Sequence, residues 1–352
     1  LHLNKNYKQI IRIQYDMKKT NINWIKKKKE GLYCIPGDFF IDPILPVEKA
    51  LITHAHSDHA RPNNKYILCS SETKDIMKLR YGDKYCQSCQ VVNYNESIKI
   101  KDVYVKVLPA GHILGSVQFL IQYNGHRLLI SGDYKRRFDL TCLPYEATNC
   151  HTFITEATFG LPIFKHPPEK NEIQKLINSI KNNKDSTHLI GVYALGKCQR
   201  LISILRSIGY DETIYLHGAL LKISEYYNNK FNNMGIIKNV SSVTPASLKN
   251  NLILCPPSSL NDKWSQKFIN IVKGYASGWM QIRQRIKQKN IEVPLVISDH
   301  ADWDEILQTV EDVVPEEVLV THGREEALVY FLKQQKYKSN ALNLIGFEDE
   351  NE

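Results

Sequence analysis

The chain has 352 residues, of which 43% are hydrophobic and 24% are charged, a composition typical of a globular protein with one large or two medium domains. The 46 Lys and Arg residues outnumber the 37 Asp and Glu residues, and the formal charge of +9 favours a polyanionic partner, although a basic surface also serves solubility. No apolar run reaches the roughly 18 residues of a membrane span, and the eight cysteines are scattered apart from the pair Cys86 and Cys89. We therefore expect a cytoplasmic protein with reduced thiols and no membrane partner.

The N-terminal segment is polar. Residues 1–30 are rich in Lys and Asn and contain a basic run at 26–29. Because few apolar positions are available to anchor such a segment, the sequence predicts a poorly ordered basic arm. The chain does not open with Met, and Met17 is one candidate for the native start.

From Gly31 onward, short apolar runs bounded by turn residues predict a strand-rich unit. The predicted strands lie at 38–42, 50–53, 66–69, 103–108, 117–123, 127–130 and 153–155. Asn124-Gly125 makes a hairpin turn between the fifth and sixth of these strands. Residues 71–79 form a predicted helix with Ser70 or Ser71 as its N-cap.

After Gly160 the pattern changes to strands that alternate with helices. The predicted helices lie at 169–181, 197–207 and 220–228, and the predicted strands at 189–193 and 213–216. This alternation predicts a parallel α/β unit over residues 161–290. Strand and helix segments return after residue 291, at 295–298, 302–313, 317–320 and 325–335.

The densest group of candidate metal ligands consists of His54, His56, Asp58 and His59, directly after the predicted strand at 50–53. This spacing suits a tight loop that folds its side chains around a point, and imidazoles and carboxylates are ligands that zinc prefers. A polar loop that happens to be His-rich is the alternative. The pattern His-x-His-x-Asp-His at a strand end is nevertheless specific, and it resembles the signature of the metallo-β-lactamase fold.

Three later residues match the remaining ligands of that family, each at the end of a predicted strand: His112, Asp133 and His322. A lone His after a strand is more often structural, but three matches in the family's order favour ligands. The resemblance implies two divalent metal ions, zinc with manganese as the alternative. It assigns His54, His56 and His112 to the first ion, Asp58, His59 and His322 to the second, and Asp133 to a position between them.

Two neighbouring dications lower the pKa of a water molecule between them and stabilise charge on a phosphoryl oxygen. The resemblance therefore implies hydrolytic chemistry. Asp42, at the end of an early strand, corresponds to the family's early aspartate and is expected to orient a ligand. A strand-end turn residue before Pro43 is the alternative reading of Asp42.

Residues 161–290 separate Asp133 from His322, with Glu156 before this insertion and His300 after it. The arrangement resembles the β-CASP nuclease branch, in which an acidic residue paired with a His is implicated in protonating the leaving oxygen. Asp58, Glu156 and His300 are thus the expected catalytic residues. The resemblance implies an α/β fold with a metallo-β-lactamase αββα core at 31–160 and 291–340, a β-CASP cap domain at 161–290 and a tail at 341–352.

Five segments carry a closer resemblance, at 31–38, 132–136, 154–160, 194–197 and 276–279. Over about residues 31–335 the chain resembles the bacterial ligase-associated DNA exonucleases, which implies DNA repair beside an ATP-dependent DNA ligase and a helicase-like protein. His322 is shared with RNA-processing β-CASP enzymes, so RNA is the alternative substrate. A small-molecule thioester or lactone hydrolase conflicts with the long insertion, and a non-catalytic nucleic-acid-binding subunit conflicts with the complete ligand set.

The expected substrate contacts are Lys135, Arg136, Lys197, Ser277 and Gly278. The first two follow Asp133 directly and are expected at the rim of the site, with a solvated turn as the alternative. Lys197 opens a predicted helix, where the N-terminus suits a phosphate. Four basic residues at 283–289 either extend a basic funnel or form one solvated helix face.

Overall fold

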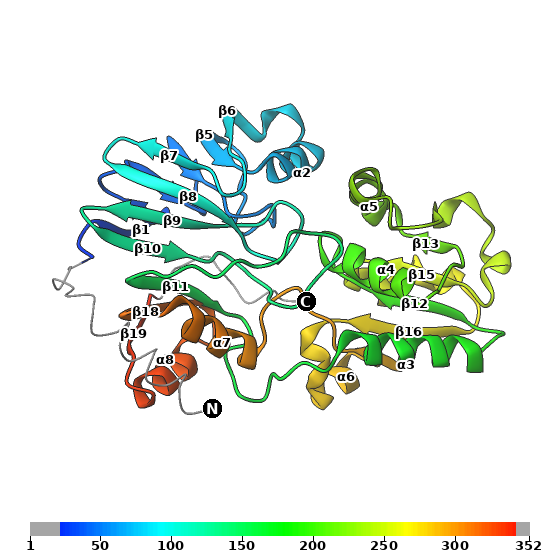
Figure 1. The fold of residues 1–352 in the computed structure, drawn as a ribbon. Coiled ribbons are helices and arrows are strands. Elements are labelled where there is room, and N and C mark those ends of the chain that lie inside the picture. Colours follow the sequence, from blue (N-terminus) through cyan, green and yellow to red (C-terminus); the bar gives the residue numbers. More distant parts are fainter. Residues whose placement is uncertain (1–21, 343–352) are drawn as a thin grey trace.

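In the computed structural model the described residues are 22–342, and they form two α/β units joined side by side (Figure 1). Met17 and the segment from residue 343 onward lie outside the described residues. The first unit contains two stacked sheets, and the second is built around one further sheet, drawn in green to yellow in Figure 1. Across residues 22–342, no helix combines the length and apolarity that a membrane span requires.

One six-stranded sheet and one seven-stranded sheet make up the first unit. The first sheet comprises β1 (Ile25–Lys28), β2 (Gly31–Cys34), β3 (Phe39–Ile41), β4 (Lys49–Leu51), β5 (Asn64–Cys69) and β6 (Cys86–Val91), in that order. The second comprises β7 (Ser97–Ile100), β8 (Val103–Pro109), β9 (Val117–Tyr123), β10 (His126–Ile130), β11 (Thr152–Ala157), β18 (Glu317–Gly323) and β19 (Lys338–Ala341). Its order across the sheet is β19-β18-β11-β10-β9-β8-β7.

The core between these sheets follows from the two-residue period of a strand. In β8, Val103, Val105 and Val107 are buried, whereas Tyr104 is 52% exposed, because alternate side chains point to opposite faces. The three valines share one apolar cluster with Phe39 of the first sheet. The two sheets therefore bury their facing sides against each other.

Helices cover the outer faces of both sheets, which completes an αββα sandwich. They are α2 (Ser71–Tyr81) on the first sheet, and α7 (Trp303–Val313) and α8 (Glu325–Gln334) on the second. Asp302 caps α7, and its side chain and that of Glu305 form a reciprocal capping box. Trp303, Ile306 and Val310 then place one apolar stripe on the sheet.

The second unit is an insertion between β11 and β18 with a parallel sheet. Its strands are β12 (Thr187–Gly191), β13 (Ile214–Leu216), β14 (Ile237–Asn239), β15 (Leu252–Cys255), β16 (Ile271–Ala276) and β17 (Val293–Leu295), in the order β14-β13-β15-β12-β16-β17. Its helices are α3 (Glu169–Asn182), α4 (Lys197–Ser207), α5 (Gly218–Phe231) and α6 (Arg283–Lys289). The short 3-10 helices of the chain are η1 (Gly82–Tyr85), η2 (Val240–Ser242), η3 (Pro245–Leu248), η4 (Pro257–Asn261), η5 (Ser265–Lys267) and η6 (Gly278–Gln281).

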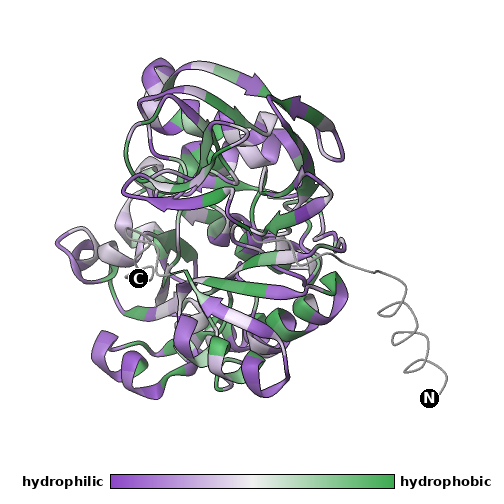
Figure 2. Cartoon of the chain, turned by 90° about the vertical axis from the view of Figure 1, so that its left-hand side faces the viewer, coloured by the Kyte–Doolittle hydropathy of each residue, from purple (hydrophilic) through white to green (hydrophobic). Residues whose placement is uncertain are grey.

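All five residues of β12 are buried, since one apolar cluster covers each face of this sheet. Parallel sheets need such cover on both sides. In Figure 2 the strands of both units are largely green, while purple gathers on loops and outward helix turns. The cluster under α4 also takes in Ile113 and Leu114 of the first unit, so one apolar core is continuous across the boundary between the units.

Two expected boundaries are wrong. The predicted disorder of the N-terminal arm fails for residues 22–30, because Trp24 and Ile25 pack against the core between the sheets and β1 pairs with β2. The first unit also resumes later than residue 291, since β17 pairs with β16 in the sheet of the insertion. The αββα core and the parallel α/β insertion themselves are as the sequence predicts.

Candidate functional site

One edge of the sandwich gathers the predicted ligands, because several strands end there. Strands β8, β10, β11 and β18 run in the same direction through the second sheet. The residues delivered at their C-terminal ends are His112, Asp133, Glu156 and His322, and the loop after β4 delivers His54, His56, Asp58 and His59. Gly132 makes the turn before Asp133 with a φ of +56°, and a Cβ there would stand 2.8 Å from Thr53.

His54, His56, His112 and Asp133 form the first cluster, and their ligand atoms all lie within 4.8 Å of one another. The inward nitrogens of His54 and His56 are 3.2 Å apart, and those of His56 and His112 are 3.0 Å apart. A tetrahedral zinc with 2.0–2.1 Å bonds to nitrogen separates its ligand atoms by about 3.3 Å. The spacing of this cluster therefore fits one such ion.

Hydrogen bonds on the outer ring edges fix the tautomers of two of these histidines. His56 donates Nε2–H to the carbonyl of Leu195 at 3.1 Å, and His112 donates Nδ1–H to the carbonyl of Asp299 at 2.9 Å, because a carbonyl can only accept. Burial lowers the pKa of His112 to about 3, so the ring is neutral. With both rings neutral, two nitrogen lone pairs face each other at 3.0 Å, an arrangement that suits a cation between them.

A second cluster contains His59, Asp133 and His322. The Nε2 atom of His59 lies 3.3 Å from Asp133 Oδ2 and 3.5 Å from Asp58 Oδ2, and the rings of His59 and His322 are stacked with centroids 4.9 Å apart. Burial lowers the pKa of His322 to about 4, which keeps the ring neutral and one nitrogen lone pair available. Asp133 thus belongs to both clusters, and its Oδ1 is buried without a hydrogen-bond partner in the described part of the chain. The residues fit two divalent ions that share this carboxylate.

Asp42 lies behind the second cluster. Its Oδ2 accepts hydrogen bonds from Nδ1 of His59 at 2.8 Å and from the hydroxyl of Thr53 at 2.5 Å, and its Oδ1 accepts from the Thr53 amide at 2.8 Å. The Thr53 hydroxyl also lies 3.1 Å from Nδ1 of His54. One buried carboxylate therefore orients His59 directly and His54 through Thr53.

Glu156 and His300 form a buried pair beside the clusters. Nδ1 of His300 is 2.9 Å from Oε2 of Glu156, and 3.9 Å from Oδ2 of Asp133. The Thr158 hydroxyl and the Tyr134 amide donate to the two oxygens of Glu156. Burial raises the pKa of Glu156, and the neighbouring His300 opposes this shift. The pair can hold and transfer one proton next to the predicted metal centre.

Comparisons with known proteins point to one family, although no family model matches the chain. A probable DNA ligase from Opitutus terrae is 27% identical over 91% of this chain. An RNase J-like protein from Methanocaldococcus jannaschii is 23% identical over 79% of this chain and 82% of its own length. Endoribonuclease ysh1 from Aspergillus fumigatus is 34% identical over 56% of this chain. The chain spans 31% of the length of the Opitutus protein and 26% of the Aspergillus protein.

These relatives agree with the resemblance of the chain to the β-CASP branch of the metallo-β-lactamase fold. A solved structure shares the fold: a protein of unknown function from Enterococcus faecalis V583, with a TM-score of 0.52 and 15% identity, covers 85% of this chain and 80% of that chain. The buried His and Asp clusters, which could hold metal ions, agree with this resemblance.

The insertion contacts the predicted metal centre through a main-chain atom. Leu195, whose carbonyl orients His56, lies just before α4. Gly196 follows with φ +86° and ψ −72°, and a Cβ there would stand 2.2 Å from Ile113 and 3.1 Å from Asp299. Only glycine fits this position without displacing its neighbours.

Two of the expected substrate contacts are not at an open rim. Lys135 is 1% exposed, and its Nζ donates to the His300 carbonyl at 2.9 Å and to Glu305 at 2.6 Å. Lys197 is 2% exposed, and its Nζ lies 3.6 Å from Asp299. The predicted rim position is therefore wrong for Lys135, which a carboxylate draws inside, and a phosphate contact by Lys197 stays a prediction.

The remaining expected contacts lie near the β-CASP boundary. Arg136 is partly exposed and pairs with Asp312 at 2.5 Å. The Ser277 hydroxyl accepts the Trp279 amide at the start of η6. A Cβ on Gly278 would stand 2.4 Å from Phe159, which lies three residues after Glu156. Contact of Ser277 and Gly278 with the substrate therefore stays a prediction.

Sequence reasoning missed Asp299 and Leu195. Burial would raise the pKa of Asp299, but Lys197 and the histidines around it outweigh burial and lower it, so the carboxylate stays ionised. Its position directly before His300 in the sequence was the available signal. The role of Leu195 comes from its carbonyl, which every residue type has, so no signal exists in its side chain.

Proposed function

We propose that this protein is a metal-dependent DNA exonuclease that hydrolyses phosphodiester bonds in DNA repair. The observation that carries the proposal is the juxtaposition of a predicted two-ion centre with the buried pair of Glu156 and His300, whose Nδ1 lies 3.9 Å from the shared Asp133. A hydrolase that must protonate a poor leaving group needs both parts in contact with one substrate.

His54, His56 and His112 would hold one ion, Asp58, His59 and His322 the other, and Asp133 both. Zinc is proposed for both ions, with manganese as the alternative, because the donor set mixes imidazole with carboxylate. When bound, such ions supply a nucleophile at neutral pH and neutralise charge on a phosphoryl oxygen.

His300 is the proposed proton donor to the leaving oxygen. Its Nδ1 faces Glu156 at 2.9 Å, so delivery of the proton is assigned to Nε2 on the other edge of the ring. Glu156 stabilises the charged imidazole and fixes its orientation, and Thr158 and Tyr134 hold Glu156 in turn. Asp133 would further favour the protonated ring.

Support for DNA comes from the relative named probable DNA ligase, which aligns with 91% of this chain, and from the segment Ser277-Gly278-Trp279. Action beside an ATP-dependent DNA ligase and a helicase-like protein is part of the proposal. The alternative is an RNA-processing ribonuclease, which is favoured by the names of the Methanocaldococcus and Aspergillus relatives.

Digestion of end-labelled linear DNA, closed circular DNA and RNA, side by side with zinc or manganese, tests the proposal. We expect progressive loss of linear DNA from an end, resistance of circular DNA and little cleavage of RNA. A clear RNA preference would establish the alternative. Cutting inside circular single strands would contradict the exonuclease assignment. Retained activity in demonstrably metal-free protein would contradict the metal centre itself.

A further inference from the structure

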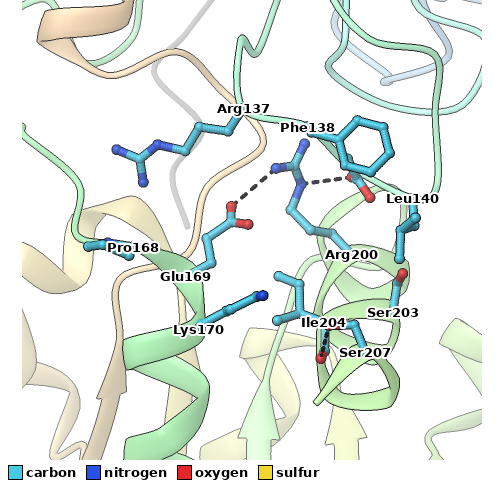
Figure 3. Close-up of a pocket in the computed structure, with 11 residues that line it drawn as sticks. Arg137, Phe138, Leu140, Pro168, Glu169, Lys170, Arg200, Ser203, Ile204 and Ser207 are labelled. Carbon is cyan, nitrogen blue, oxygen red and sulfur yellow. Dashed lines mark hydrogen bonds and ion pairs between the residues drawn. The ribbon is translucent and has the colours of Figure 1, made fainter. Parts of the chain in front are cut away.

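A cavity away from the predicted metal centre lies between the core loop at residues 137–140 and helices α3 and α4 of the insertion (Figure 3). Its volume is about 440 Å³, within the range of sites for small organic groups. Phe138, Leu140, Pro168 and Ile204 supply most of its apolar wall. None of these residues belongs to the predicted metal centre or to its acid–base pair.

The apolar wall is unusually open to solvent. Phe138 is 68% exposed, and Leu140, two residues further along the chain, is 47% exposed. Large apolar side chains that group at the mouth of a cavity are a candidate binding surface. In Figure 3 the Phe138 ring lies beside Leu140 at the edge of the pocket.

A buried guanidinium holds the floor of the cavity in place. Arg200 is 1% exposed, and its Nε and Nη1 lie 2.9 Å from Asp139 and 3.1 Å from Glu169. Its Nη2 donates to the carbonyl of Gly111 at 3.4 Å, the residue before the predicted ligand His112. The floor of the cavity is therefore held in place by ion pairs, and a hydrogen bond joins it to the loop that carries the predicted ligand His112.

The lining offers one exposed cation at Lys170. Arg200 pairs with the two carboxylates Asp139 and Glu169, and Arg137 pairs with Asp302 outside the lining at 2.7 Å. Lys170 is exposed, and within residues 22–342 its ammonium group has no ion pair. Lys170 is therefore the cation that a phosphate at the mouth of the cavity would meet.

One polar side chain in the wall points to a ligand. Ser203 is 2% exposed, and its hydroxyl is buried without a hydrogen-bond partner in the part of the chain that the structure describes. Buried hydroxyls normally find a partner. A ligand in this cavity would meet apolar faces on Phe138 and Pro168, a hydroxyl at Ser203 and a cation at Lys170.

We propose that this cavity binds an unpaired base of single-stranded DNA, stacked on Phe138, with its polar edge at Ser203 and the adjoining phosphate at Lys170. Apolar faces, a polar edge and a neighbouring anion are the properties of a nucleotide, and stacking on an exposed aromatic ring accepts any base. The inference rests on the proposed function and deepens it, because it assigns a single-stranded substrate.

The test measures binding without hydrolysis. Fluorescein-labelled oligo(dT) and an abasic oligonucleotide of the same length are titrated with the full chain in chelator, and binding is followed by fluorescence anisotropy. Phe138→Ala should weaken binding of oligo(dT) roughly 5- to 150-fold, the range for losing one stacking platform, and should leave the abasic strand almost unaffected. Phe138→Trp should keep the affinity and report binding through a change in its own fluorescence.

Tyr330 on α8 is a matched control, since its aromatic side chain is also 68% exposed and it does not line the cavity. Tyr330→Ala should bind oligo(dT) as the unaltered protein does. Unchanged binding by Phe138→Ala would overturn the proposal and leave the apolar wall to a protein contact. An equal loss for both oligonucleotides would also overturn it. If the base-dependent binding is found but no nucleic acid is cleaved with any metal, the proposed function fails instead.

Discussion

Gly196 offers the sharpest test of whether the insertion helps to build the metal centre. The structure places Leu195, whose carbonyl orients His56, immediately before a residue with φ +86° and ψ −72°. A Cβ at Gly196 would stand 2.2 Å from a methyl carbon of Ile113, whereas ordinary carbon contacts are about 3.5–4.0 Å. In Gly196→Ala one of the two segments must therefore move by at least about 1.3 Å.

Two costs add in this variant. Holding alanine in so sparsely populated a backbone region costs about 1–3 kcal/mol, and overpacking a buried contact costs about 1–3 kcal/mol. The expected loss of unfolding free energy is thus about 2–6 kcal/mol, less than the stability of many domains. Displacing the carbonyl from His56 should also weaken metal binding about 10- to 100-fold, the usual effect of losing a partner of a ligating histidine.

Gly209 is the matched control, because it has φ +85° near the other end of α4 and a Cβ there meets nothing within 4 Å. Gly209→Ala should lose only the backbone cost of about 1–3 kcal/mol and bind metal normally. Urea unfolding of the metal-free proteins and competition with a metal indicator measure the two effects. Normal metal affinity in Gly196→Ala would refute the role given to the Leu195 carbonyl.

Further outcomes follow from the same contacts. Purified protein should carry close to two equivalents of zinc or manganese by elemental analysis, and chelation should abolish nuclease activity that added metal restores. Asp42→Asn should weaken metal binding about 10- to 100-fold in the indicator assay, because an amide cannot accept all three hydrogen bonds that Asp42 accepts from Thr53 and His59. Asp38→Asn, at another aspartate with positive φ but in a surface ion-pair group, should bind metal normally.

The local parts of the fold are predictable where one period dominates. The bounds of α4 match the sequence prediction, since its apolar residues recur at helical spacing on a buried face. The candidate ligands were predicted from the pattern that resembles the metallo-β-lactamase signature, and the structure gathers them because the C-terminal ends of co-directional strands meet at one edge. Strand β1 was not predictable, because four consecutive lysines indicate an exposed segment. Its start is nevertheless held by Trp24 and Ile25, which pack against the core.

The exposure of charged residues is hard to predict from the sequence, because it depends on contacts with residues far along the chain. Lys135 looks like a rim residue in the sequence because it follows Asp133, but the carboxylate that draws it inside is Glu305, 170 residues further along. Lys197 is likewise buried beside Asp299. A charge in the sequence indicates exposure only if no distant partner compensates its burial.

Substitution of His300 distinguishes two roles for this residue, protonation of the leaving oxygen and ligation of a metal ion. His112, Asp299 and His300 also lie close enough to form a metal group, so a ligand role has to be tested. If His300 protonates the leaving oxygen, His300→Ala should keep both metals and lose about 10²–10⁴-fold in turnover, the usual range for a general acid.

Glu156→Gln should lose turnover in the same direction, because the amide cannot stabilise the imidazolium that now lies 2.9 Å from a carboxylate oxygen. The two losses should not add in the double variant, since the residues act as a unit. A nitrophenyl phosphodiester needs little protonation of its leaving group, so it should largely restore the activity of His300→Ala but not that of His322→Ala, which disturbs the second ion. Loss of metal from His300→Ala, or an equal defect on the activated substrate, would make His300 a ligand or a structural residue instead of the acid.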